Sequence, residues 1–429
     1  MRISRFAAAC VFVACQLSQI AHAESSDLSS LQKSVEEMKI MLQSLQTTVS
    51  RQQGEIEKLR YENESLKSSN VPQEVHSLPP AQSSGSSKQA QYLPDIGVVA
   101  DVVGLSSESR DDEEGNDRFS VRDFEIVFGH DIDPYSRLDA TVVFSDEEDP
   151  ELEEAYASFW DFPFDSQLRF GRLKPKVGIV SAMHRDSLDT VDVPLVIQRY
   201  LGAEGLSKTG ADVTGYVPLP FDSFTQALTF GVLEGGNGEE GQLFGETKRI
   251  PTFYARLKNA VDVSDETSVD LGASWLNGSI DDDSGREANS VGLDFTLTHF
   301  VSPTQKLKLQ SEAFIVDRDL PGASEESEEE DLTYLSHDNP WGYYVLADYR
   351  FDERWGVGSR WDWVEPIATE LDVERDHENA LSTYLTFYQS EFARWRFQYQ
   401  RAEGIDDVSD NRFFLQGTFA IGTHKHQIQ

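Results

Sequence analysis

The residues that could do chemistry in this chain are basic side chains interleaved with acidic ones, a pattern that suits ion binding better than catalysis. No Gly-x-Ser-x-Gly, His-Glu-x-x-His or phosphate-binding glycine loop occurs in the sequence. His424 and His426 have no third ligand close to them in the sequence, so we predict no metal site there. We therefore expect no catalytic residue, no metal and no cofactor, and a protein that is not an enzyme.

The candidate ion-contacting residues are basic side chains in extended segments and in a long connection at 176–208. Selectivity in a pore depends on its width and on the charges at its narrowest point. The predicted constriction or selectivity residues are Arg172, Lys174, Lys176, Arg185, Arg199, Lys208, Arg256, Lys258, Lys306, Lys308, Arg394 and Arg396.

The formal net charge of the whole chain is -38, with 75 acidic and 37 basic residues. This balance argues against a nucleic-acid partner, because a protein surface that binds nucleic acid is rich in lysine and arginine. The acidic residues lie mainly in connections, and the basic residues lie partly in extended segments. The net charge therefore does not decide whether cations or anions would be preferred.

The segments that carry these charges alternate between apolar and polar residues. Leu138, Ala140, Val142 and Phe144 share one face of such a segment. About sixteen segments of this kind are long enough to cross a bilayer as tilted strands, and they predict an all-β fold, an antiparallel transmembrane β-barrel. They are 95–105, 118–129, 135–145, 152–162, 166–175, 209–219, 223–234, 251–262, 267–277, 288–300, 304–316, 341–351, 354–364, 379–390, 392–403 and 411–422.

The connections alternate between short and long. Those after even-numbered segments are tight and rich in Pro, Asp and Ser, whereas most of the others are longer and acidic. Short turns on one rim and long loops on the other are typical of an outer-membrane barrel. The connection at 176–208 also contains apolar residues, among them Ile197 and Leu201. We expect it to fold inward and narrow the channel, with two alternatives: an external loop packed on its neighbours, or a contact between subunits.

The N-terminal part predicts three further regions. Residues 1–23 form an expected signal peptide, with an apolar run followed by Ala21-His22-Ala23. Residues 24–67 predict a coiled coil, because an apolar 4-3 spacing runs through six heptads from Leu28 to Leu66. Residues 68–90 predict a flexible linker rich in Ser, Pro and Gln. The barrel domain would then span 91–429, and the coiled coil would lie in the periplasm.

This layout resembles the phosphate-selective porin O/P family. The residues that carry the resemblance are Phe170-Gly171-Arg172-Leu173-Lys174-Pro175, Asp192-Val193-Pro194-Leu195, Gly205-Leu206-Ser207 and the ending from Phe413 to Gly422. The resemblance implies an outer-membrane homotrimer, a passive channel for small ions and solutes with anions such as phosphate as candidates, and basic residues of loop and wall as ligands. Membrane lipids and other copies of the chain are the expected partners.

A second hypothesis is a non-conducting or partner-filled barrel. Such a barrel would act as a sheath, or as an envelope scaffold through its periplasmic coiled coil.

Overall fold

The computed structural model describes residues 94–109, 117–146, 149–217, 219, 223–236, 242–245, 249–280, 287–319, 337–368, 376–405 and 409–422. The predicted signal peptide at 1–23, coiled coil at 24–67 and linker at 68–90 lie outside the described residues. Within the described ranges, no helix combines the length and the apolar character needed to cross a membrane.

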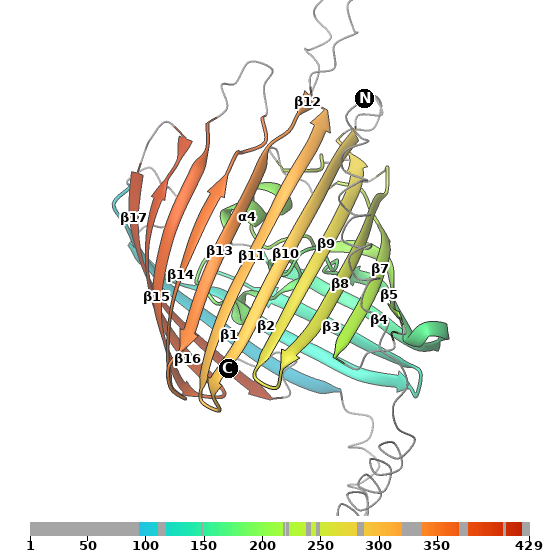
Figure 1. Ribbon diagram of the computed structural model, residues 1–429, viewed down its shortest axis with the longest axis horizontal. Helices are drawn as coiled ribbons and strands as arrows, with labels where there is room; N and C mark the ends of the chain where they lie inside the picture. Colours follow the sequence, from blue (N-terminus) through green and yellow to red (C-terminus); the bar gives the residue numbers. More distant parts are fainter. Residues whose placement is uncertain are drawn as a thin grey trace, which may run out of the picture. The chain divides into compact units, whose positions relative to one another are not determined.

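The described residues form one antiparallel sheet that closes on itself (Figure 1). β1 pairs with β17 as well as with β2, with Ala100 opposite Phe419, and this pairing completes the ring. The strands are β1 (Asp95–Ser107), β2 (Arg118–Asp133), β3 (Ser136–Phe144), β4 (Glu151–Phe162), β5 (Ser166–Leu173), β6 (Lys208–Val217), β7 (Phe224–Leu233), β8 (Thr252–Ser264), β9 (Thr267–Ser279), β10 (Glu287–Ser302), β11 (Gln305–Asp319), β12 (His337–Asp338), β13 (Trp341–Arg350), β14 (Trp355–Val364), β15 (Glu378–Ser390), β16 (Ala393–Glu403) and β17 (Ser409–Gly422).

Sixteen of these strands are long, and β12 is a two-residue strand that pairs with the end of β11. The predicted closed barrel of about sixteen antiparallel strands is confirmed, and every predicted segment coincides with a strand whose ends differ by a few residues. β2 runs on to Asp133, and β5 stops at Leu173, shortly before Pro175. A proline cannot donate a hydrogen bond to a neighbouring strand, which explains the early end of β5. The two-residue β12 was not predicted.

The barrel wall has polar side chains on its inner face and apolar side chains on its outer face. Along β16, Arg394, Arg396, Gln398 and Gln400 are buried, whereas Phe397 is 50% exposed. The same alternation recurs in other strands, for example in β11 and β14, where Glu312 and Arg360 are fully buried. A water-soluble sheet protein places its apolar face inside, so this polarity is inverted. It is the polarity expected of a barrel whose outer face meets lipid.

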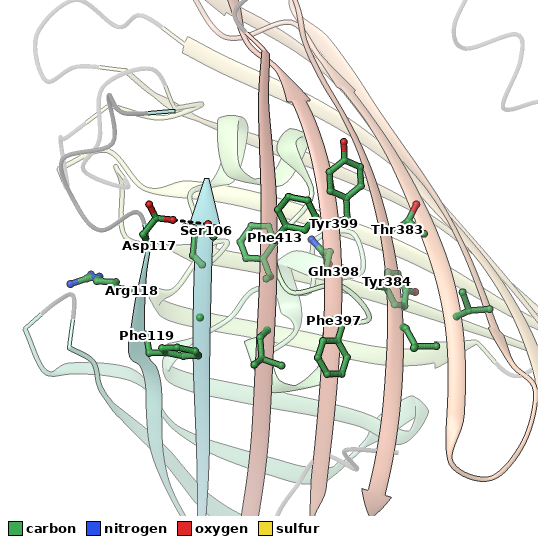
Figure 2. Close-up of a pocket in the computed structure, with 16 residues that line it drawn as sticks. Ser106, Asp117, Arg118, Phe119, Thr383, Tyr384, Phe397, Gln398, Tyr399 and Phe413 are labelled. Atoms are coloured by element: carbon green, nitrogen blue, oxygen red, sulfur yellow. Dashed lines mark hydrogen bonds between the residues drawn. The ribbon is translucent and has the colours of Figure 1, made fainter. Parts of the chain in front are cut away.

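Aromatic residues group near the strand ends on the outer face. The rings of Trp341 and Trp363 lie 4.4 Å apart, and those of Trp355 and Phe387 lie 4.7 Å apart near the opposite rim. Figure 2 shows Phe119, Phe397 and Phe413 lining an apolar groove of about 750 Å³ over β1, β2 and β14–β17. Aromatic rings favour the membrane–water interface, so both features agree with a lipid-facing surface.

Candidate pore constriction

The longest described connection, residues 174–207 between β5 and β6, lies inside the barrel; we call it the inward loop. It contains the short helices η5 (Val180–Ala182), η6 (Arg185–Ser187) and α4 (Leu195–Leu201). α4 begins after Pro194 and ends at Gly202, whose φ of 105° suits glycine. It packs against β13, β14 and β15, and Figure 1 shows it behind these strands. The predicted inward fold is therefore observed, and the external-loop alternative is wrong.

Apolar packing holds one side of the inward loop to the wall. Val196, Ile197 and Tyr200 of α4 are fully buried in a cluster with wall residues that face inward. The wall contributes Tyr254, Leu276, Phe314, Val316, Tyr344, Leu346 and Val364. Burial of each large apolar side chain contributes about 1.5–3 kcal/mol, so this small core inside the barrel is a substantial attachment.

Arg360 of β14 anchors the middle of the inward loop. Its guanidinium donates to Asp192 Oδ2 at 2.5 Å and to the Asp192 carbonyl at 2.7 Å, and it also donates to Asp362 on its own strand at 2.7 Å. The Arg360 side chain is fully buried. Burial alone would raise the pKa of Asp192, but Arg360, Gln398 and Gln400 lower the pKa below its usual value. The arginine thus holds a charged carboxylate of the loop against the wall.

β16 binds the backbone of the inward loop. Arg394 donates to the Asp186 carbonyl at 2.6 Å, and Arg396 donates to the Leu188 carbonyl at 3.0 Å. Gln398 accepts from the Val191 amide at 2.8 Å. These three side chains alternate along β16, so each reaches a successive part of the loop.

β11 binds the start of the loop through one carboxylate. Glu312 accepts from the amides of Ile179 at 2.7 Å and Val180 at 2.9 Å, and from the Tyr344 hydroxyl at 2.8 Å. Since a buried carboxylate needs hydrogen-bond donors, these three bonds stabilise Glu312 and the loop backbone together.

On the opposite wall, His184 of the loop contacts acidic residues of β2 and β4. Its Nδ1 lies 2.9 Å from Glu153 Oε2 and 3.7 Å from Glu125 Oε2, and its Nε2 lies 3.1 Å from Glu154 Oε2. Burial alone would lower the pKa of His184, but Glu153 and Glu154 raise it well above its usual value. Lys174 also pairs with Glu153, with Nζ 2.6 Å from Oε1.

Eleven of the predicted selectivity residues lie on the inner wall and the inward loop, and most have acidic or carbonyl partners. Arg172 is the exception, because it neighbours the inward-facing Leu173 on β5 and therefore lies on the outer face of the strand. Seven form ion pairs: Arg172 with Glu151, Lys174 with Glu153, Arg185 with Glu204, Arg199 with Glu378, Arg256 with Asp294, Lys258 with Asp270, and Lys308 with Asp189. Lys208 donates to the Gly236 carbonyl, and Lys176 donates to Thr214. Lys306 is half-buried in β11.

Burial divides the predicted residues into two groups. Lys174, Arg256, Arg394 and Arg396 are buried, and their contacts hold the inward loop to the wall. Lys208 is also buried, but it donates to the Gly236 carbonyl, outside the inward loop. The side chains of Arg199 and Lys258 are 47% and 49% exposed, so they still face water. Burial lowers the pKa of Lys176 to about 8, and the nearby charge of Arg169 adds to this effect.

Open space remains beside α4. A cavity of about 510 Å³ separates the loop from β1 and β15–β17. Its charged lining includes four acidic and two basic side chains: Asp192, Glu378, Glu403, Asp410, Arg199 and Arg412. The lining of this cavity therefore carries both signs of charge, with more acidic than basic side chains.

Several residues that hold the loop were not singled out from the sequence, chiefly Glu153, Glu154 and Tyr344. Glu153 and Glu154 are consecutive and both buried, which accompanies a shift in the pairing of β3 with β4 and does not follow from strand alternation. The inward position of Gln398 was predicted, but its partner in the loop was not, because no local pattern relates Gln398 to Val191, which is 207 residues away.

Comparison of the sequence with protein-family models and with curated proteins finds no match, so the resemblance to the phosphate-selective porin O/P family is not confirmed. Solved structures of porins are similar in fold. An anion-selective porin from Comamonas acidovorans is 11% identical, with a TM-score of 0.52 over 77% of this chain and 99% of that chain. Pseudomonas putida OprB is 11% identical, with a TM-score of 0.52 over 78% and 95%. Salmonella typhi OmpF is 12% identical, with a TM-score of 0.51 over 76% and 97%.

Proposed function

We propose that this chain is a porin of a Gram-negative outer membrane, a passive diffusion channel for small ions and solutes that the inward loop constricts. The observation that carries the proposal is the combination of an inverted, closed sixteen-strand barrel with a loop bound inside it. An apolar outer face suits lipid, a polar inner face suits water, and a loop attached to the inner wall narrows the path between them.

The preference of the channel between cations and anions depends on the charges that still face water. Arg199 lies beside the cavity next to α4, opposite acidic residues such as Glu378 and Glu403. Arg394 and Arg396 are buried against the loop backbone, so we assign them to shaping the constriction. Anion or phosphate preference, which the sequence resemblance implies, would require the exposed bases Arg199 and Lys258, with the half-buried Lys306, to outweigh the neighbouring acids.

A second candidate function is an envelope scaffold or sheath that conducts little. The apolar cluster inside the barrel favours it, because Val196, Ile197 and Tyr200 fill space that water would occupy in an open pore. The predicted periplasmic coiled coil at 24–67 would then supply the attachment.

The proposal includes a homotrimer and a periplasmic coiled coil. Both come from the sequence: the heptads at 24–67 could join chains, and the short connections on the rim where β1 begins favour a periplasmic position for that rim. Chemical cross-linking of the detergent-purified chain, with and without residues 24–67, tests the trimer. Three cross-linked bands that persist without the coil would assign assembly to the barrel.

Liposome swelling tests the proposed function with uncharged solutes. Vesicles containing the refolded chain should swell in isotonic arabinose faster than in the larger sugar raffinose, because a constricted pore sorts solutes by size. Vesicles containing the heat-denatured chain serve as the control. Equal, slow swelling in both sugars would contradict a channel and favour the scaffold.

A further inference from the structure

We infer that His184, Glu153 and Glu125 form a binding site for one divalent transition-metal cation, with Zn²⁺ as the probe, which joins the inward loop to β2 and β4. The sequence analysis predicted no metal site, and the inference does not depend on whether the barrel conducts. The three residues come from three different elements, and their ligand atoms lie within 4.8 Å of one another.

The hydrogen bonds of the His184 ring indicate which of its nitrogens could bind a metal ion. If His184 Nε2–H donates to Glu154 Oε2 at 3.1 Å, the Nδ1 lone pair faces the oxygens of Glu153 and Glu125. Metal-binding histidines commonly donate their second ring N–H to a carboxylate in this way. Three acceptor atoms that face one another need a cation between them.

A single proton cannot form hydrogen bonds that include His184 Nδ1, Glu153 and Glu125 together. A proton on Nδ1 can bond Glu153 Oε2 at 2.9 Å, but Glu125 Oε2 lies 3.7 Å away and makes no hydrogen bond. Glu125 is only 3% exposed, so its carboxylate is not hydrated either. A buried carboxylate oxygen without a donor is costly. A metal ion would bond to this oxygen, to Glu153 and to Nδ1 at once.

The distances between the ligand atoms are close to those of a tetrahedral Zn²⁺ site. Ligand atoms about 2.1 Å from a tetrahedral Zn²⁺ lie ~3.4 Å from one another. The distances from Nδ1 to Glu153 and Glu125 are 2.9 Å and 3.7 Å, on either side of that value. One imidazole with two carboxylates suits a transition metal better than Mg²⁺ or Ca²⁺, which prefer oxygen ligands alone.

A bound metal ion would also suit the charges of the cluster. With Glu125, Glu153 and Glu154 ionised, as in the metal-bound state, the three carboxylates carry three negative charges and Lys174 supplies one positive charge. A divalent cation with a neutral His184 then brings the sum to zero. A small recess opens beside the cluster, and its charged lining has more acidic than basic side chains: Asp123, Asp149, Glu151, Glu153 and Glu204 with Arg122 and Arg185.

Calorimetric titration of the detergent-folded chain with Zn²⁺, after removal of metal by a chelator, tests the site. The parent chain should carry His424→Ala and His426→Ala and no histidine tag, so that the C-terminal histidines bind nothing. We expect one Zn²⁺ per chain, and Glu125→Gln should weaken binding by more than the ~10- to 100-fold that loss of an outer-shell partner costs, because Glu125 is a direct ligand. Glu353→Gln is the control, because Glu353 is exposed in the connection between β13 and β14, and this variant should bind as the parent does.

No saturable binding by the parent, or equal binding by the parent and Glu125→Gln, would overturn the inference. X-ray absorption of the zinc-loaded parent supplies a result that does not depend on a variant folding. It should show a single imidazole nitrogen and otherwise oxygen ligands, and this nitrogen signal should disappear in His184→Gln. Two or more imidazoles at the metal would also overturn the assignment.

Discussion

Arg360 illustrates how single residues fix the lumen of this barrel. Its guanidinium contacts Asp192 of the inward loop and Asp362 of its own strand, and all its donors point into the protein. A lumen charge that met only water would be easily replaced. Here the fully buried guanidinium pairs across two elements, with the buried Asp362 and the partly buried Asp192, so the bond geometry matters for both stability and the path of the loop.

The substitution Arg360→Met tests this anchoring role. It leaves Asp192 and Asp362 buried without their main partner, and breaking a buried pair in this way costs about 3–5 kcal/mol. We expect the free energy of unfolding in micelles to fall by about that amount, measured by urea titration with tryptophan fluorescence. Arg401→Met is the control, because Arg401 is 54% exposed and its pair with Glu403 should contribute less than ~1 kcal/mol. Equal losses in both variants would contradict the anchoring role.

The pH dependence of stability tests His184 in chelator-treated protein. Because the pKa of His184 is raised in the folded state above its usual 6.5, folding favours the protonated form. This contribution is fully present below pH 6.5 and is lost as the pH rises through the raised pKa. We expect the urea midpoint to fall with rising pH in the parent and to fall less in His184→Gln. Lys176 also titrates near this pH, because its pKa is about 8. The difference between the two chains isolates the contribution of His184 from that of Lys176. Parallel curves for the two chains would refute this assignment.

Arg199 is the residue whose charge we expect to affect ion preference. Its side chain is 47% exposed beside the cavity next to α4. Arg199→Glu changes the charge by two units and should shift permeation toward cations by about thirty-fold, since each unit charge at close range in water contributes ~1 kcal/mol. The reversal potential in a salt gradient measures the shift. Arg396→Gln, at a buried position, should change ion preference less than Arg199→Glu; the opposite order would show that the buried bases sense the permeating ion.

Among the elements, the inward loop differs most from the strands that hold it. Its helices are short, and α4 has only seven residues. Helices of this length are marginal on their own, so its shape depends on the wall residues that bind it. The wall in turn buries charges that an empty lumen would leave in water. Loop and wall therefore form one packed unit, which we propose to be the constriction.

Excision of the loop tests whether it is the constriction. A chain with residues 179–204 replaced by a short Gly-Ser linker should show single-channel conductance several-fold above that of the intact chain. A chain shortened within 322–331, in the acidic connection between β11 and β12, is the control and should conduct as the intact chain does. Unchanged conductance after excision of the inward loop would mean that another part of the chain limits the flow of ions.

Strand positions could be predicted from the sequence, whereas the contacts of the loop could not. The alternation of Arg394, Arg396, Gln398 and Gln400 with apolar residues is a local signal, and a one-residue error would place arginines in lipid. The inward position of 176–208 also followed from its apolar content. The partners of the loop did not, because a pair such as Arg360 and Asp192 joins distant segments. The burial of Arg394 and Arg396 likewise depends on where the loop runs.

At the scale of the whole barrel, the apolar outer face requires an apolar environment. Large apolar side chains such as Phe230 and Leu293 are 61% exposed, and they recur around the outer face. A surface of this kind is unfavourable in water and favourable against acyl chains. The closed ring also leaves no long strand without a partner on both sides, as a membrane interior requires.

Planar-bilayer recording of the detergent-purified wild-type chain tests most directly whether this barrel conducts through a constricted lumen. We predict discrete, uniform current steps from the folded protein, grouped in threes if the chain is a trimer, and none from heat-denatured protein. Bilayers that contain folded, heat-modifiable barrel but show no current steps would contradict the channel and favour the scaffold.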